Sequence, residues 1–123
     1  MWFGQACVWE DKSMSYYLYQ LSYSAEAVKA MIANPSDRKA AAAKLVEGLG
    51  GKLHHLFFAF GKYDVVCLVE ANDDKAAAAG AMAVAASGTV SSFITTKLFP
   101  AEEAMDMMKM AGKASGTYRP PMN

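Results

Sequence analysis

The sequence of 123 residues lacks an excess of either charge, because twelve lysine and arginine residues balance twelve aspartate and glutamate residues. A protein that binds nucleic acid normally presents a basic surface to the phosphates, so this balance argues against that class. No apolar run approaches the ~18–20 residues that a membrane-spanning helix requires. A chain of this length can bury the core of one domain without disulfides or structural metals. The composition therefore predicts a single soluble domain with no nucleic-acid partner and no membrane span.

Cysteine and histidine are also scarce. Cys67 lies in the apolar run 65–69, where a free thiol behaves as a small buried hydrophobic group, and nothing indicates that Cys7 is paired. A reducing, cytoplasmic location is the simpler interpretation. His54 and His55 are the two histidines, and no HxxxH, HxH or CxxC spacing occurs. We therefore expect neither a dedicated metal site nor a cofactor.

The two ends of the chain differ from its middle. Residues 1–13 have no basic segment before their apolar residues, and the apolar stretch is too short for a secretory signal. They are either an ordered extension or a segment before the main start, and both alternatives stay open. We expect one α+β domain over residues 14–111. Residues 112–123 contain glycine, serine and two prolines and predict an irregular tail.

Local patterns predict four strands with helices between them. The segments 16–23, 53–60, 63–71 and 89–99 are strand-like because aromatic and β-branched residues are frequent in them. Helices are expected over 24–33, 36–49, 72–86 and 101–110. Asn34-Pro35 should interrupt the first helical connection, because the residue before a proline avoids the helical conformation. Gly61-Lys62 is typical of a two-residue type II′ hairpin turn between the second and third strands.

This order of elements, β-α-β-β-α-β followed by a C-terminal helix, predicts a ferredoxin-like α+β fold. A weak internal repeat agrees with it, since Lys39 and Lys75 each precede four alanines. Both faces of the second and third strands are substantially apolar, whereas helices can cover only one face of the sheet. Exposed apolar patches of that size are rare on monomers. We therefore expect a homodimer in which two sheets pack face to face.

Several short motifs lie around the predicted hairpin. They are Gly50-Gly51-Lys52-Leu53, Phe60-Gly61-Lys62-Tyr63-Asp64-Val65-Val66, Val69-Glu70-Ala71 and Asp73-Asp74. With Arg38 and the Ala-Ala-Ser-Gly run at 85–88, they make the segment 17–99 similar to the GYD domain family. The resemblance implies a dimeric α+β barrel fold and no established biochemical function. Related dimeric α+β barrels include cofactor-independent monooxygenases, haem-degrading enzymes and small-ligand-sensing domains, which are analogies of fold alone.

The candidate catalytic residues lie on the second strand and at the hairpin. His54 and His55 are neighbours on a strand, so we expect them to point to opposite faces, and one of them could act as an acid or base. Tyr63 and Asp64 have two interpretations. In the first, Tyr63 has a packing role and Asp64 accepts hydrogen bonds from the backbone of the turn. In the second, both residues form the polar rim of a pocket and Asp64 acts as a general base.

The candidate ligand-binding residues are aromatic or charged. Tyr17, Tyr19 and Phe58 would line an apolar pocket. Arg38 begins a helix, where a cation is mildly unfavourable, so we expect it to bind a carboxylate of the protein or of an anionic ligand. Glu70 would pair with a lysine or arginine at the sheet edge or, across a dimer axis, meet a residue of the other subunit.

Two functions remain open at this level. The first is a homo-oligomeric small-ligand-binding or assembly module, whose partners are a second copy of the chain and a hydrophobic small molecule. The alternative is a cofactor-independent small enzyme, monooxygenase- or isomerase-like, that acts on a hydrophobic or aromatic substrate. The four methionines between residues 105 and 110 indicate an amphipathic helix suited to packing or docking rather than to metal binding.

Overall fold

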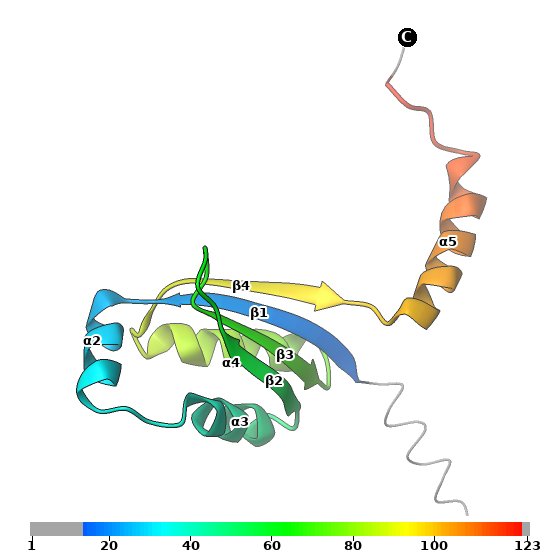
Figure 1. Ribbon diagram of the computed structural model, residues 1–123. Helices are drawn as coiled ribbons and strands as arrows, with labels where there is room; N and C mark the ends of the chain where they lie inside the picture. Colours follow the sequence, from blue (N-terminus) through cyan, green and yellow to red (C-terminus); the bar gives the residue numbers. More distant parts are fainter. Residues whose placement is uncertain (1–13, 122–123) are drawn as a thin grey trace, which may run out of the picture.

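The computed structural model describes residues 14–121 as a four-stranded antiparallel sheet with helices on one face and a projecting C-terminal helix (Figure 1). The strands are β1 (Ser15–Tyr23), β2 (Lys52–Phe58), β3 (Val65–Ala71) and β4 (Val90–Leu98). The helices are α2 (Ala25–Ala33), α3 (Arg38–Gly48), α4 (Asp74–Ala86) and α5 (Ala101–Ser115). The strand order β2-β3-β1-β4 is that of a ferredoxin-like fold, which confirms the predicted class.

Short-range hydrogen bonds determine where the helices begin. Ser24, Asp37 and Asp73 each accept a hydrogen bond from the backbone N–H three residues further along, at 3.1, 3.1 and 2.9 Å. Such N-caps typically contribute about 1 kcal/mol each. Gly50 and Gly88 follow α3 and α4 with φ angles of 82° and 74°, which glycine adopts without a steric penalty. These caps explain why the helical segments could be predicted from the sequence.

Three helix boundaries differ from the predicted ones by two residues or more, and one of them is the start of α4, at Asp74 rather than at residue 72. Helix α3 begins at Arg38 rather than at Ser36, because Asp37 supplies its cap. Helix α5 continues to Ser115, beyond the predicted end near Met110. None of the helices within residues 14–121 is long and apolar enough to cross a membrane.

The connection between β2 and β3 is not the predicted type II′ turn. That turn needs a positive φ at Gly61, which does not have one. Instead, the N–H of Ala59 donates to the carbonyl of Asp64 at 2.8 Å, which leaves residues 60–63 in the loop. The N–H of Asp64 donates to the carbonyl of Leu21 in β1, also at 2.8 Å. The longer loop therefore forms because the start of β3 is held by β1.

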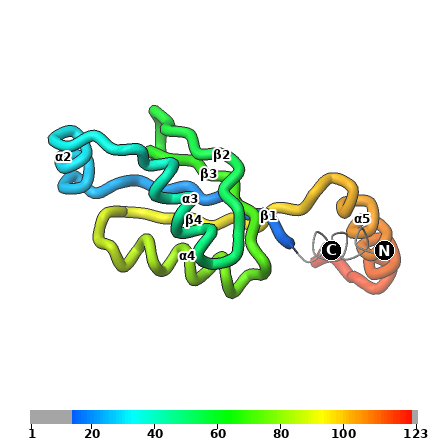
Figure 2. Tube along the Cα trace, turned by 90° about the horizontal axis from the view of Figure 1, so that it is seen from below, coloured from blue at the N-terminus to red at the C-terminus, as the bar shows by residue number. Residues whose placement is uncertain are grey.

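The core lies on the sheet face that α3 and α4 cover (Figures 1 and 2). Its buried strand residues alternate along β1 and β3 and are Tyr17, Tyr19, Leu21, Val65, Cys67, Val69 and Ala71. Ala77 and Gly80 are buried on the facing side of α4. Because both are small, α4 can approach the sheet without large side chains between them.

The other face of the sheet, which we call the open face, is covered by none of the described helices. Its residues on the two central strands are Tyr16, Leu18, Gln20, Val66, Leu68 and Glu70. The edge strands add Phe57 and Ile94, which are 62% and 41% exposed. The expectation that both faces carry apolar residues is thus confirmed.

Helix α5 leaves the end of β4 and projects away from the sheet (Figure 1). All of its residues except Ala104 are exposed, including Met105, Met108 and Met110. Met107 and Met108 lie on the side opposite Glu102, Asp106, Lys109 and Lys113, whereas Met110 follows Glu103 and Asp106 by seven and four residues and lies beside them. The helix is therefore amphipathic, and its methionine side is uncovered by the rest of residues 14–121.

Candidate functional site

A cavity of about 240 Å³ lies between the core side of the sheet and helices α3 and α4. We call it the helix-side cavity. The helix residues that line it are mostly small, and they include Ala42, Ala76, Ala77, Gly80 and Ala83. The cavity is partly open to solvent, because Ala83, Ser87 and Thr89 in its lining are exposed. The short side chains of α3 and α4 leave the rest of this space unfilled.

The polar groups around the helix-side cavity are few. The hydroxyl of Tyr19 already donates to the carbonyl of Ala77 at 2.6 Å. Burial raises the pKa of the Cys67 thiol to about 11, so the thiol is protonated and uncharged at neutral pH. Ser87 and Thr89 add two hydroxyls near the end of α4. The cavity can therefore accept an apolar molecule with little polar surface.

Arg38 lies where the helix-side cavity meets an outer hollow of about 380 Å³. The outer hollow is lined in part by Tyr23, Met31, Ile32, Phe58 and Asp64. Arg38 Nε is buried without a hydrogen-bond partner among the described residues, and Nη1 lies 3.5 Å from Ser36 Oγ. Within residues 14–121, no carboxylate lies within ion-pair distance of this guanidinium. The positive charge of Arg38 is therefore only weakly stabilised by the groups of the protein around it.

The two histidines share the open face, so the prediction that they point to opposite faces was wrong. A β-bulge between Leu53 and His55 inserts one extra residue into β2, which breaks the strict alternation of side chains. His55 is paired with Leu68 of the open face, and His54 Nε2 lies 2.7 Å from Glu70 Oε1 on the same face.

His54 and Glu70 form a partly buried pair, with side chains 26% and 17% exposed. The ring of Tyr16 lies beside His54, at 5.9 Å between ring centroids. The carboxylate orients the imidazole, and such a pair can hold or move a proton. Glu70 thus pairs with a histidine of its own chain, rather than with the lysine or arginine that one of the two sequence-based interpretations expected. His55 is exposed and stacks on Phe57 at 5.8 Å.

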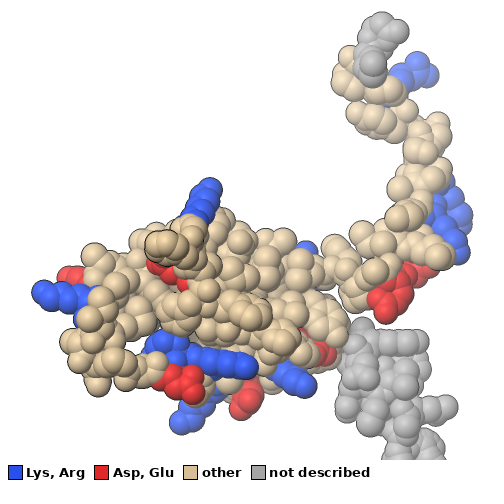
Figure 3. Space-filling model, viewed as in Figure 1, with Lys and Arg blue, Asp and Glu red and all other residues tan. Residues whose placement is uncertain are grey.

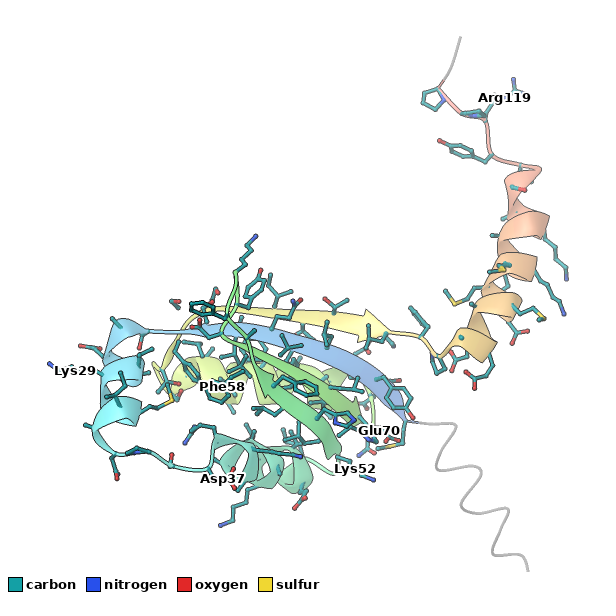
Figure 4. The ribbon with its side chains drawn as sticks, in the orientation of Figure 1. Lys29, Asp37, Lys52, Phe58, Glu70 and Arg119 are labelled. Atoms are coloured by element: carbon teal, nitrogen blue, oxygen red, sulfur yellow. The ribbon has the colours of Figure 1, made fainter. Side chains whose placement is uncertain are left out.

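Tyr63 and Asp64 lie at the other end of the β2–β3 hairpin. Figure 4 shows Phe58 near that end and Lys52 and Glu70 near the opposite one. The carboxylate of Asp64 accepts a hydrogen bond from the backbone N–H of Tyr23 at 2.9 Å, which holds the hairpin to the end of β1. Tyr63 is half-buried, and Lys62 Nζ lies 5.7 Å from the centre of its ring. Within one chain, Asp64 is therefore separated from the His54–Glu70 pair.

The model of the GYD domain family matches residues 17–108, a segment that includes the whole sheet except its first residues. The chain belongs to the GYD domain family. This confirms the resemblance inferred from the hairpin motifs. A search of curated proteins gives no match to the sequence.

Two further candidate residues have mainly structural contacts in this GYD domain. The hydroxyl of Tyr17 donates to Asp74 Oδ1 at 2.5 Å, and Lys97 Nζ donates to the same oxygen at 2.9 Å. Burial and the bond to Asp74 raise the pKa of Tyr17 to about 12, while the two donors lower the pKa of Asp74. Tyr17 therefore links β1 to α4 and β4 rather than lining the cavity. Phe58 is 60% exposed and lies beside Tyr23, at 6.3 Å between ring centroids.

No group of three or more histidine, cysteine, aspartate or glutamate side chains in the described part of this GYD domain could hold a metal ion. The structure thus separates the predicted site residues into three places. Tyr19 and Arg38 line the helix-side cavity, and Arg38, Phe58 and Asp64 line the outer hollow. His54, His55 and Glu70 lie on the open face.

Proposed function

We propose that this GYD-domain protein is a homo-oligomeric small-ligand-binding module whose ligand occupies the helix-side cavity. The observation that carries the proposal is an apolar cavity of about 240 Å³ within a domain of this size. An engineered apolar cavity of about 150 Å³ in another protein binds benzene, so this one has room for a body of about ten non-hydrogen atoms. An apolar molecule would gain free energy there by leaving water.

The open face supports the homodimeric part of the proposal. Leu18 and Leu68 lie opposite each other at its centre, with Val66 and Ile94 nearby. Where the sheet is visible in Figure 3, uncharged residues cover most of it. A second copy that packed on this face would bury these side chains by the same contacts on both subunits. The helix-side cavity lies on the opposite face, so each subunit of such a dimer keeps its own ligand site.

Replacing Ala42 with leucine is expected to weaken binding of the uncharged aromatic probe 2-naphthamide by about tenfold or more. The added carbon atoms would occupy part of the cavity, and loss of about two buried methylene equivalents from the ligand corresponds to such a factor. Isothermal titration calorimetry measures the dissociation constant of each variant.

Ala41→Leu is the matched control, because Ala41 is an exposed neighbour on α3 that does not line the cavity. It should bind the probe as the wild type does. Equal binding by the Ala42→Leu variant, or no binding of apolar probes to the wild type, would refute a ligand site in the helix-side cavity.

The His54–Glu70 pair favours a second candidate function, a cofactor-independent enzyme of the monooxygenase or isomerase type. The 2.7 Å contact gives the open face an oriented imidazole beside Tyr16, in apolar surroundings. Proton abstraction from a hydrophobic or aromatic substrate is the step that such a pair could perform.

Deuterium uptake from heavy water into an enolisable aromatic ketone, followed by NMR, tests this second function. Activity lost in His54→Gln and in Glu70→Gln, but retained in His55→Gln, would assign proton transfer to the pair. The control is suitable because His55 is exposed and lies outside the pair. Equal exchange in all three variants, or none above the buffer rate in the wild type, would contradict it.

A further inference from the structure

We propose that the ligand of the helix-side cavity is an apolar monocarboxylate whose carboxylate group binds Arg38. This inference rests on the proposed function, since it specifies the chemistry of the ligand at that site. A linear or aromatic hydrocarbon body would fill the cavity, and the acid group would lie at its junction with the outer hollow.

The charge of Arg38 is the first argument. Among the described residues, Arg38 is the one charged side chain that lines the helix-side cavity. Two acidic residues of the protein are engaged elsewhere, because Asp37 caps α3 and Glu70 pairs with His54. A guanidinium beside an apolar space is costly unless an anion compensates it.

The hydrogen-bonding state of Arg38 is the second argument. Its Nε is buried without a partner in the described chain, and its one hydrogen bond there, to Ser36, is long at 3.5 Å. Guanidinium binds a carboxylate through two parallel N–H donors, which a single hydroxyl cannot replace. A small rotation of the flexible side chain would therefore exchange an unsatisfied donor for a charge-assisted pair.

The position of Asp64 determines on which side of Arg38 the ligand lies. Asp64 lines the outer hollow together with Arg38, and its carboxylate would repel a second anion there. No acidic residue of the described chain lines the helix-side cavity. The ligand carboxylate is therefore expected on the cavity side of Arg38, with its apolar body directed toward the alanines of α3 and α4.

The single cation also limits the class of ligand. One guanidinium can compensate one carboxylate, whereas a dicarboxylate or a phosphate ester would bring further charge into apolar surroundings. The volume suits a body of about ten non-hydrogen atoms. A naphthoic acid or a medium-chain fatty acid meets both conditions.

The test compares 2-naphthoate with the uncharged 2-naphthamide, which has nearly the same shape. Calorimetric titration at pH 7 is expected to show at least about tenfold tighter binding of the acid to the wild type, as one charge-assisted pair would give. Arg38→Met should remove this preference by weakening the acid alone. Lys39→Met removes a neighbouring exposed cation and should leave the preference unchanged.

Each contrary result has a distinct meaning. The carboxylate inference is overturned if acid and amide bind the wild type equally, or if Lys39→Met removes the preference as Arg38→Met does. In both cases, the proposal that the helix-side cavity binds a small ligand is unaffected. If neither compound binds, the proposed function is overturned with it. Retained amide binding shows that the Arg38→Met variant is folded, and Arg38→Gln repeats the comparison with a polar residue if Arg38→Met misfolds.

Discussion

Replacing Leu68 with lysine is expected to convert the proposed homodimer into a monomer. Leu68 lies at the centre of the open face, opposite Leu18 on β1 and His55 on β2. In a face-to-face dimer, the substitution would bury an unpaired ammonium group in each subunit. An uncompensated buried charge costs about 3–5 kcal/mol, so the dissociation constant should rise at least ~100-fold. Sedimentation velocity over a micromolar concentration series measures this change.

Met82→Lys is the matched control for this prediction. Met82 is 72% exposed on α4, the helix that covers the other face of the sheet, so its replacement adds the same charge without touching the open face. The control should associate as the wild type does. A wild type that is monomeric at these concentrations, or a Leu68→Lys variant that still dimerises normally, would contradict packing through the open face.

The fold could be predicted because its signals are local. Ser24 and Asp73 cap helices by contacts within one turn, and Gly50 and Gly88 follow helices in conformations that favour glycine. Such signals fix the order of elements, and that order allows few sheet topologies. The predicted ferredoxin-like fold therefore did not depend on knowledge of distant contacts.

The errors arose where a distant strand determines the local conformation. The loop after β2 is longer than predicted because Asp64 binds two backbone groups of β1, at Leu21 and Tyr23. The two histidines share a face because β2 carries a bulge where it pairs with β3. A sequence pattern assumes a regular strand and a free hairpin, and it contains no information on either contact.

The candidate site was predictable only in part. Arg38 was expected to bind a carboxylate, since a cation is mildly unfavourable at the start of a helix. The alanines that line the cavity, such as Ala42 and Ala76, were instead interpreted as part of a weak internal repeat. Whether a small side chain faces a void depends on the separation of helix and sheet, which appears only in the folded structure.

Gly51 has a role that only the folded structure shows, although it belongs to the motif Gly50-Gly51-Lys52-Leu53 identified in the sequence. The Gly50-Gly51 pair directly follows the helix predicted over 36–49, and the φ of 82° at Gly50 is typical of a glycine that ends a helix. Gly51 has another role, because a Cβ at this position would lie 2.4 Å from the carbonyl oxygen of Glu70 and 3.1 Å from Val46 Cγ1. The backbone of β3 passes too close to the start of β2 to admit any side chain.

Gly51→Ala is therefore expected to lower the free energy of unfolding by about 3 kcal/mol, because a backbone carbonyl in a sheet cannot move aside cheaply. For a domain of this size, the melting temperature should fall by about 10 °C or more. Gly48→Ala, at the end of α3, has nothing within 4 Å of the added Cβ and should leave the melting temperature unchanged or slightly raised. Thermal and urea unfolding of the two variants measure the difference. Equal free energies of unfolding would show that the backbone of β3 can shift at Glu70 to accommodate the methyl group. The expected loss of stability would explain why a second glycine follows Gly50.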